Sequence, residues 1–457
     1  MNRGWISPRH AAVAVLSFGA IAIYVLNYPG SLEYDSLVQL VEGRTASYSN
    51  WHPPVMSFLL GLSDWLPGPP AIWYLAGLYF ILFGALAALF WLRPRPSWAG
   101  VVAAGAILFL PQTFLSQATV WKDCLFADTV LAGFVAIGLA ARRWHHTGLR
   151  LGWLLASALL LALAVLTRQN GVVVVPCAAA TLGLIAGRRS NWRKGLSYGG
   201  SFFAAVAVIA FLSNAALQTR ADDYPAKAEQ FKVLELYDIT GMVYADLDMP
   251  LTVLEKEAPK LAWLIRTEAV ARWTPLLNDT LEVPRIVKVL EATPEPVMAR
   301  QWRSLIYHYP LRYLQIRALY FRWVFLPPRV DLCHPYHVGD RGDPEDLQAL
   351  GMHERINARD VMLWHVGDAM VSAGFYSHGI FALIGLGVLV LVLRRRRDGD
   401  LVIGGLIAAS AAFTATFFVI SIACDYRYLC LIDLSAMAGV VYAAADWRGL
   451  FGKAAKA

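Results

Sequence analysis

The sequence predicts an all-α membrane protein, in which about ten transmembrane helices carry a small, mostly helical extracytoplasmic domain. Two observations lead to this prediction. Of the 457 residues, 57% are hydrophobic and only 16% are charged, whereas a soluble domain carries roughly a quarter charged residues. The apolar residues also gather in runs of about the length that crosses a bilayer. Such a chain must bury apolar surface against lipid as well as inside a protein core.

The candidate spans follow one another closely along two parts of the chain. They are expected at 10–28, 71–92, 98–116, 124–141, 151–167, 170–187, 196–214, 376–393, 401–423 and 428–446. The first run resembles a secretory signal, but Asn27-Tyr28-Pro29 lacks the small residues of a cleavage site. We therefore interpret it as an uncleaved first span.

Basic residues mark alternate loops between these spans. They are Arg3 and Arg9, Arg93 and Arg95, Arg142, Arg143 and Arg150, Arg188, Arg189, Arg193 and Lys194, Arg394 to Arg397, and Arg448, Lys453 and Lys456. The positive-inside rule predicts that these loops and both termini are cytoplasmic. The compact size of the chain is typical of a protein of the bacterial inner membrane. The +7 net charge thus reflects topology, and no nucleic-acid partner is expected.

The first outer loop, 29–70, is expected to hold two helices that do not cross the bilayer. The stretch 53–66 is short and bracketed by prolines, which indicates an interfacial or re-entrant helix. Before it, a helix lying on the membrane is predicted from two opposite faces. The apolar face holds Tyr34, Leu37, Val38 and Val41, and the polar face holds Asp35, Gln39 and Glu42.

The chain divides into three parts by this pattern. Residues 1–214 form a module of seven spans, 215–375 an extracytoplasmic domain, and 376–457 a module of three spans. Helices are expected within the middle part at 226–237, 251–272, 285–292 and 300–324. Arg312, Arg317 and Arg322 stand there among aromatic residues, which is typical of a helix at the headgroup boundary.

Cysteine and histidine spacing indicates neither a disulfide framework nor a metal centre. The chain has five cysteines without paired spacing. Those in or beside apolar runs are expected as buried thiols: Cys124, Cys177, Cys424 and Cys430. A denser group matches no standard zinc spacing and is interrupted by Pro335: Asp331, Cys333, His334, His337, Asp340 and Asp343. No nucleotide-binding fingerprint is present, so no cofactor is expected.

Short polar constellations stand at the outer ends of the predicted spans. They are Asp35, His52, Lys122-Asp123, Arg168-Gln169-Asn170 and Asp425-Tyr426-Arg427-Tyr428. Each has an ordinary structural alternative: a solvated helix face or first-turn acid for Asp35, a helix boundary for His52, a local ion pair for Lys122-Asp123, and membrane anchors for the arginines and tyrosines. Ionisable residues at this depth are costly, and their gathering at one face indicates one site.

The order of these segments resembles the GT-C superfamily of integral-membrane glycosyltransferases, which includes bacterial mannosyl- and aminoarabinose-transferases. The resemblance is carried by Tyr34-Asp35, Trp51-His52-Pro53-Pro54, Lys122-Asp123, Leu166 to Gly171, His308-Tyr309-Pro310 through Arg317, and Asp425 to Tyr428. It implies inverting transfer, at the outer face, of a sugar from a polyprenyl-phosphate donor to a lipid, glycan or protein acceptor. The loop lacks Asp-x-Asp, so a metal-dependent mechanism is not implied.

The resemblance also implies roles for individual residues. Asp35 would be the general base and Asp123 a second catalytic carboxylate. The lipid phosphate would be held by Lys122, Arg168 and Arg427, and the substrates by Glu33, His52, Asn170, Asp425 and Tyr426. The alternative functions are a membrane transporter or lipid flippase, which would place polar residues near the midplane, and a non-catalytic scaffold.

Overall fold

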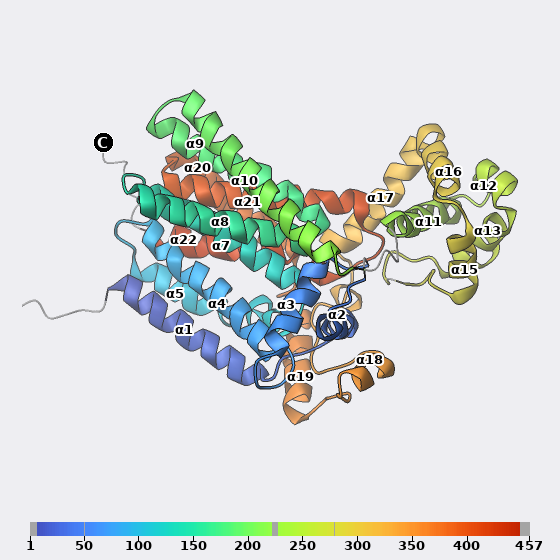
Figure 1. Cartoon of the computed structure of the whole chain (residues 1–457), viewed down its shortest axis with the longest axis horizontal. Helices are drawn as coiled ribbons and strands as arrows, with labels where there is room; N and C mark the ends of the chain where they lie inside the picture. The colour runs from blue at the N-terminus through green and yellow to red at the C-terminus, as the bar shows by residue number, and fades with distance from the viewer. Residues whose placement is uncertain (1–6, 50, 222–226, 278, 448–457) are drawn as a thin grey trace, which may run out of the picture.

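The computed structural model describes residues 7–49, 51–221, 227–277 and 279–447 and confirms the all-α membrane architecture. Within these residues nine helical segments are long and apolar enough to cross a membrane. Their helices are α1 (Pro8–Asn27), α4 (Ile72–Ala88), α7 (Lys122–Arg142), α8 (Thr147–Thr167), α9 (Val174–Arg189), α10 (Trp192–Gln218), α20 (His378–Arg395), α21 (Asp398–Ile420) and α22 (Cys430–Ala445). They pack into one bundle around a shared hydrophobic core (Figure 1).

A tenth candidate crossing is a helix pair broken by a sharp bend. The sequence predicts one continuous span at 98–116, but α5 (Trp98–Ile107) and the segment Pro111–Ala118 meet at a bend of 67°. Pro111 begins the second piece, and Leu110 before it is extended. Proline lacks the amide hydrogen that a continuous helix needs, and it disfavours helical geometry in the preceding residue. The predicted span is therefore interrupted before Pro111.

The arginine-rich loops meet at one end of the bundle. Arg9 donates to the carbonyl oxygens of Arg93 and Pro94 at 2.6 and 2.9 Å, and the buried Arg93 pairs with Asp400 and Asp446. The start of α1 and the end of α22 lie at this end, and α11–α16 lie at the other (Figure 1). Arg3, Arg448, Lys453 and Lys456 lie outside the described residues. Alternate loops therefore share one face, as the basic pattern requires.

The first outer loop folds into α2 (Tyr34–Thr45) and α3 (Pro54–Asp64). The two helices touch backbone to backbone where Gly43 faces Gly61. A Cβ atom added at Gly43 would lie 2.3 Å from the carbonyl oxygen of Ser57 and 2.6 Å from the nitrogen of Gly61. Only glycine permits this approach, so the close packing of α2 on α3 depends on it.

The faces of α2 differ from those predicted. Gln39 and Glu42, placed by the sequence on the polar face, are buried, whereas Tyr34 of the apolar face is 58% exposed. Glu42 accepts hydrogen bonds from Ser57 Oγ at 2.5 Å and from the backbone nitrogen of Ser49 at 2.9 Å. Because protein groups replace water as its partners, this carboxylate packs inward against α3.

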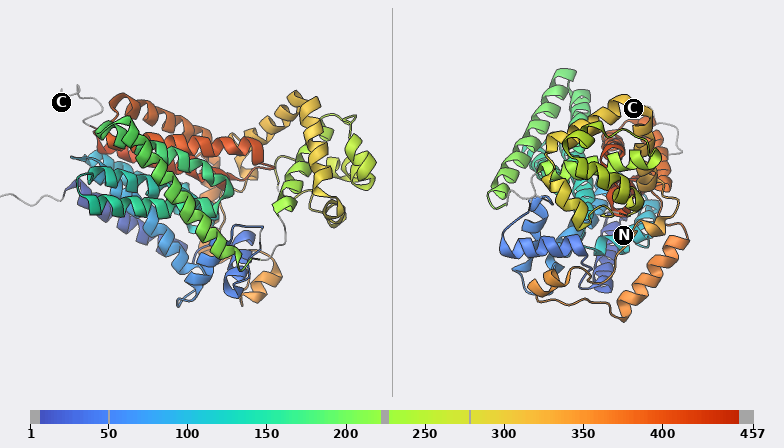
Figure 2. Two further views of the ribbon diagram at one scale, coloured as in Figure 1. Left: turned by 45° about the horizontal axis from the view of Figure 1, so that its top comes forward. Right: turned by 90° about the vertical axis from the view of Figure 1, so that its right-hand side faces the viewer.

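A lobe of helices stands beyond the end of the bundle opposite the arginine loops, as the left view of Figure 2 shows. It comprises α11 (Lys227–Ala245), α12 (Thr252–Glu257), α13 (Pro259–Leu264), η4 (Ile265–Ala269), α14 (Val270–Arg272), α15 (Pro284–Ala292), α16 (Glu295–His308) and α17 (Pro310–Phe325). It has a hydrophobic cluster of its own. The helices predicted at 251–272 and 300–324 are each interrupted, where Pro259 and Pro310 begin new helices.

Arg317 on α17 joins the lobe to the bundle. The sequence predicts this residue at the headgroup boundary, but its side chain is fully buried. It pairs with Asp238 and donates to the carbonyl oxygens of Val419 and Ser421 at 2.5 and 3.0 Å. A buried guanidinium needs such partners for its donors. The headgroup prediction is therefore wrong at Arg317.

Segment 330–372 returns from the lobe to the bundle through η5 (Val330–Leu332), α18 (Pro344–Ala349) and α19 (Ala358–Ser372). Leu347 and Leu350 join the main hydrophobic core. Asp340 accepts from the backbone nitrogen of Leu32 at 3.1 Å and pairs with Arg355 at 2.8 Å. These contacts hold the first outer loop against the bundle.

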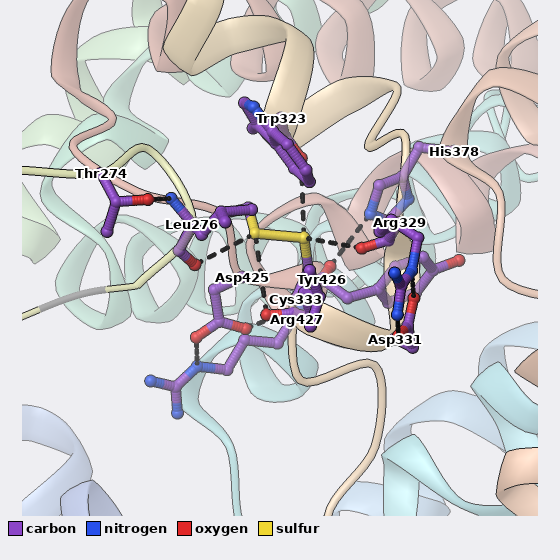
Figure 3. Close-up of a disulfide and its surroundings, with 12 residues drawn as sticks. Thr274, Leu276, Trp323, Arg329, Asp331, Cys333, His378, Asp425, Tyr426 and Arg427 are labelled. Atoms are coloured by element: carbon purple, nitrogen blue, oxygen red, sulfur yellow. Dashed lines mark hydrogen bonds and ion pairs between the residues drawn. A yellow bond between two sulfur atoms is a disulfide. The ribbon is translucent and has the colours of Figure 1, made fainter.

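Cys333 and Cys424 form a disulfide between this segment and the loop after α21 (Figure 3). The expectation of a buried thiol at Cys424 is therefore wrong. The two cysteines are 91 positions apart, so local spacing carries no sign of the pair. Cys124, Cys177 and Cys430 are free, and all but the half-buried Cys177 are buried.

Candidate functional site

A cavity of ≈ 710 Å³ lies between the lobe and the end of the bundle opposite the arginine loops. The bundle side contributes mainly charged and polar groups: Asp35, Ser49, His52, Lys122, Arg168 and Arg427. The lobe side contributes mainly apolar groups: Val233, Leu236, Leu281, Val287 and Leu290. The cavity therefore has a charged floor that faces a mainly apolar wall.

Backbone pairing brings the first outer loop to the start of α7. The backbone nitrogen of Ser31 donates to Ala118 at 3.0 Å, and that of Val120 donates to Ser31 at 3.0 Å. Ser36 Oγ adds a bond to the carbonyl oxygen of Val120 at 2.6 Å. Asp35 lies in the first turn of α2, and Lys122 begins α7. This pairing therefore sets the two side chains next to each other.

Asp35 is surrounded by three nitrogen-bearing side chains. Its Oδ2 lies 2.9 Å from Arg427 Nη2 and 3.9 Å from Lys122 Nζ, and its Oδ1 lies 3.6 Å from His52 Nε2. The carboxylate remains 24% exposed and lines the cavity. It is thus held in place by cations while one side stays open to an incoming group.

His52 links Asp35 to Lys122 in its neutral form. Its Nδ1 lies 2.9 Å from Lys122 Nζ, and an ammonium can only donate, so Nδ1 accepts. Its hydrogen is then on Nε2, which faces Asp35. Burial, reinforced by the Lys122 charge, lowers the pKa of His52 to about 3. The ring is therefore a neutral bridge at physiological pH.

Arg427 is the centre of the charged floor. Besides Asp35, it contacts Glu33 and Asp425, whose Oδ2 lies 2.8 Å from Nε. Asp123 is farther away, at 3.9 Å. One guanidinium thus gathers carboxylates from the first outer loop and from the segment after α21, as its planar fork of donors allows.

Arg168 is fixed from below by Asp123 and from the sides by aromatic rings. Its guanidinium carbon lies 5.9, 5.4 and 5.2 Å from the ring centroids of Phe413, Phe417 and Tyr428. Asp123 pairs with it and is itself buried. Asp123 does not line the cavity, and its carboxylate is placed to orient the arginine.

Four of the five residues proposed for substrate contact do not line the cavity. Asn170 donates to Thr416 Oγ1 at 2.9 Å. Tyr426 is buried and donates to Asp433 at 2.7 Å. Asp425 is buried beside Arg427, and burial raises the pKa of its carboxyl to about 8. Glu33 also lies outside the lining but contacts Arg427 directly.

The lobe supplies cavity residues that the sequence analysis missed. Tyr237, Asp279 and Glu282 line the wall opposite Asp35. Burial raises the pKa of Glu282 to about 7, with the neighbouring Asp279 carboxyl adding to the shift. None of these residues belongs to a motif or follows a predicted span, so the sequence carries no signal for them.

A second groove adjoins the cavity at His52, which lines both. It has a volume of ≈ 370 Å³. Its walls come from α3, α8 and α10, with Pro53, Pro54, Val165, Leu166, Gln169, Ala210, Phe211, Asn214 and Gln218 as the other lining residues. Phe211 is 71% exposed on a spanning helix. The groove therefore runs from the charged floor to the outer surface of the bundle.

The Asp/Cys/His cluster at 331–343 is dispersed into other contacts. Asp331 pairs with Arg329, Cys333 is in the disulfide, and Asp340 pairs with Arg355. Across the residues that the structure describes, no group of three or more His, Cys, Asp or Glu side chains has the arrangement to hold a metal ion.

Comparison with known proteins yields a distant structural likeness. No protein-family model matches the chain, and no curated protein matches its sequence. A crystal structure of the Archaeoglobus fulgidus oligosaccharyltransferase, tethered through a disulfide bond to an acceptor peptide containing the NVT sequon, aligns with 12% identity and a TM-score of 0.40. The alignment covers 94% of this chain and 49% of that one. The chain thus spans about half the length of that enzyme.

Proposed function

We propose that this protein is a membrane glycosyltransferase that moves a sugar from a polyprenyl-phosphate donor to a hydroxyl- or amine-bearing acceptor, with inversion at the sugar. The observation that carries the proposal is the meeting of Asp35 with Lys122, Arg168 and Arg427 in one cavity at the end of the bundle. A carboxylate base beside several cations suits a reaction that removes a proton and releases a phosphate.

The bond changes are those of a single displacement. Asp35 takes the proton from the acceptor, whose oxygen or nitrogen forms a bond to the anomeric carbon. The bond from that carbon to the phosphate oxygen breaks, and the polyprenyl phosphate leaves with the electron pair. Attack opposite the leaving group inverts the configuration. The 24% exposure of Asp35 leaves one carboxylate face open for the acceptor.

The cations would stabilise charge that grows on the leaving phosphate. Arg427 and Lys122 contact Asp35 in the structure. A phosphate that binds their remaining donors competes with Asp35 for them and leaves the carboxylate freer to accept a proton. Donor binding and activation of the base are therefore coupled in this mechanism.

The second groove suits the lipid part of such a donor. It joins the charged floor at His52 and ends among apolar side chains of spanning helices, including Phe211. A prenyl chain lying there keeps its hydrocarbon out of water while its phosphate reaches Lys122. We propose this groove as the path of the chain.

The disulfide supports a site outside the cytoplasm. Disulfides persist in oxidising compartments such as the bacterial periplasm, and Cys424 directly precedes Asp425 at the charged floor. The arginine loops lie at the opposite end, where the positive-inside rule expects cytoplasm. We therefore propose that the active site faces the periplasm or the cell exterior.

The test is a transfer assay in proteoliposomes that contain polyprenyl-phosphate sugars, comparing wild type with Asp35→Asn and Asp64→Asn. Asp64 also lies in the first outer loop but pairs with Arg44 away from the cavity. We expect Asp35→Asn to lose about 10²- to 10⁴-fold in turnover, the usual contribution of a general base, while donor binding persists and Asp64→Asn stays active.

Two results would overturn this proposal. Normal turnover by Asp35→Asn would remove Asp35 as the base. Wild-type protein that moves no sugar, but moves a lipid or solute across the same vesicles, would establish the transporter or flippase alternative.

A further inference from the structure

A closed hydrogen-bond unit lies inside the bundle behind the charged floor. The Tyr426 hydroxyl donates to Asp433 Oδ2 at 2.7 Å and accepts from Gln112 Nε2 at 2.9 Å. Asp433 Oδ1 lies 2.8 Å from His378 Nδ1. The His378 ring stacks on the Tyr426 ring at 3.9 Å between centroids. All four side chains are buried, so water does not compete for these bonds.

The contacts also define where the unit holds its protons. His378 Nε2 lies 3.0 Å from the carbonyl oxygen of Tyr426, which can only accept. That nitrogen therefore carries a hydrogen. One further proton lies between His378 Nδ1 and Asp433 Oδ1, whichever atom holds it. Each side-chain polar atom of Tyr426, His378 and Asp433 thus has a partner. Buried polar groups that are satisfied in this way are rigid, and deleting one of the three leaves unpaired polar groups.

This hydrogen-bond unit holds Tyr426, the residue directly before Arg427. Tyr426 and Arg427 belong to the single turn η6 (Tyr426–Leu429), which is too short to define its own conformation. Figure 3 shows the Arg427 guanidinium and the His378 ring on opposite sides of this segment. The backbone nitrogen of Tyr426 donates to Cys333 at 2.8 Å, so the turn is held on its buried side.

We propose that Tyr426, anchored by Asp433 and His378, is a positioning residue that aims Arg427 into the cavity. In this role Tyr426 does not contact substrate. The catalytic consequence rests on the proposed glycosyl transfer, whereas the placement of Arg427 against Asp35 is independent of it. The two ideas can therefore fail separately.

Four variants test the proposal. Tyr426→Phe keeps the stacked ring but removes the hydroxyl. Asp433→Leu removes both acceptors. Asp433→Asn preserves the geometry, since its amide oxygen accepts from Tyr426 and its nitrogen donates to a neutral His378. Ser435→Ala is the matched control, because Ser435 is buried on the same helix α22 and its hydroxyl bonds only to Ser410 and to the carbonyl oxygen of Ile432, outside the unit.

The decisive readouts are the affinity for a polyprenyl phosphate without sugar, kcat and KM measured separately, and the position of Arg427 in cryo-electron microscopy maps. We expect Tyr426→Phe and Asp433→Leu to weaken that affinity about tenfold or more, as for a lost charge-assisted contact, and to displace Arg427 from Asp35. Asp433→Asn should stay near wild type. Ser435→Ala should lower the melting temperature while keeping both affinity and geometry.

The proposal fails if Tyr426→Phe keeps wild-type affinity with Arg427 in place, or if Ser435→Ala weakens affinity equally. If the wild-type protein transfers no sugar, the proposed function fails, and the map of Tyr426→Phe still decides the positioning role. Arg427 displaced in that map supports positioning, and Arg427 unmoved overturns it.

Discussion

Arg427 donates through Nη2 to Asp35 Oδ2 at 2.9 Å, although the two residues are 392 positions apart in the chain. This contact joins the first outer loop to the segment between α21 and α22. Each residue also has partners from its own part of the chain. Asp35 contacts His52 and Lys122 in the N-terminal part, and Arg427 contacts Asp425 in the C-terminal part. The candidate site is therefore a junction between the two ends of the sequence.

Replacing Arg427 by lysine tests the importance of the forked contact. Lysine keeps the charge but offers one point donor, so it cannot hold Asp35, Glu33 and Asp425 together. We expect kcat/KM for sugar transfer to fall about 10²-fold, as when one preorganised donor is lost. Arg322→Lys is the matched control, an exposed arginine of α17 away from the cavity. Equal activity of both variants would show that charge alone suffices at Arg427.

Removing the disulfide should weaken both the fold and the site. Cys333→Ser with Cys424→Ser frees the chain next to Asp425, and we expect unfolding free energy to fall by about 2–5 kcal/mol. Differential scanning fluorimetry and transfer activity would measure the two effects, with Cys177→Ser, at a free and half-buried thiol, as control. Alkylation of unfolded, unreduced protein should label three cysteines. Labelling of all five would contradict the pairing.

Gly43→Ala should separate α2 from α3. The added methyl would lie 2.3 Å from the carbonyl oxygen of Ser57, and such overpacking costs about 1–3 kcal/mol. Because Asp35 lies on α2 and His52 directly precedes α3, we expect transfer activity to fall with the melting temperature. Gly77→Ala on α4, where an added methyl meets nothing within 4 Å, is the control. A Gly43→Ala protein of wild-type stability would refute the close packing.

His52 should make the protein sensitive to acid. Its folded pKa of about 3 lies below the ordinary value of 6.5, so between these values the unfolded chain binds the extra proton more readily. The stabilisation that His52 provides is complete above pH 6.5 and is lost as pH falls toward 3. Melting temperatures from pH 8 to pH 4 should therefore fall less for His52→Gln than for wild type. Parallel curves would mean that His52 does not carry this effect.

Hydropathy and charge placement were sufficient to predict the membrane architecture. A membrane span can be recognised in the sequence because nearly every residue of a contiguous run must tolerate lipid. The arginine-rich loops alternate because the orientation of each span follows the charge of its flanking loops. The breaks at Pro111, Pro259 and Pro310 are also encoded locally, because proline interrupts a helix wherever it stands inside one. The predicted segments 98–116, 251–272 and 300–324 did not include these breaks.

The candidate site residues could be named from the sequence because charged groups at the ends of apolar runs are unusual. Their roles needed the fold. The sequence resemblance assigned Asp123 to catalysis and Tyr426 to substrate contact, yet the first is buried against Arg168 and the second against Asp433. Helical periodicity also misplaced Gln39 and Glu42, since the partner that buries them belongs to α3.

By itself, the sequence determined what can be settled within about twenty neighbouring residues, namely which segments enter the membrane and which polar groups stand at their ends. Tertiary structure decided the pairings across long chain separations: Arg427 with Asp35, Cys333 with Cys424, and the lobe wall with the charged floor. The physical reason is that burial and hydrogen bonding depend on which surfaces meet in space, and one sequence carries no periodic signal for such meetings.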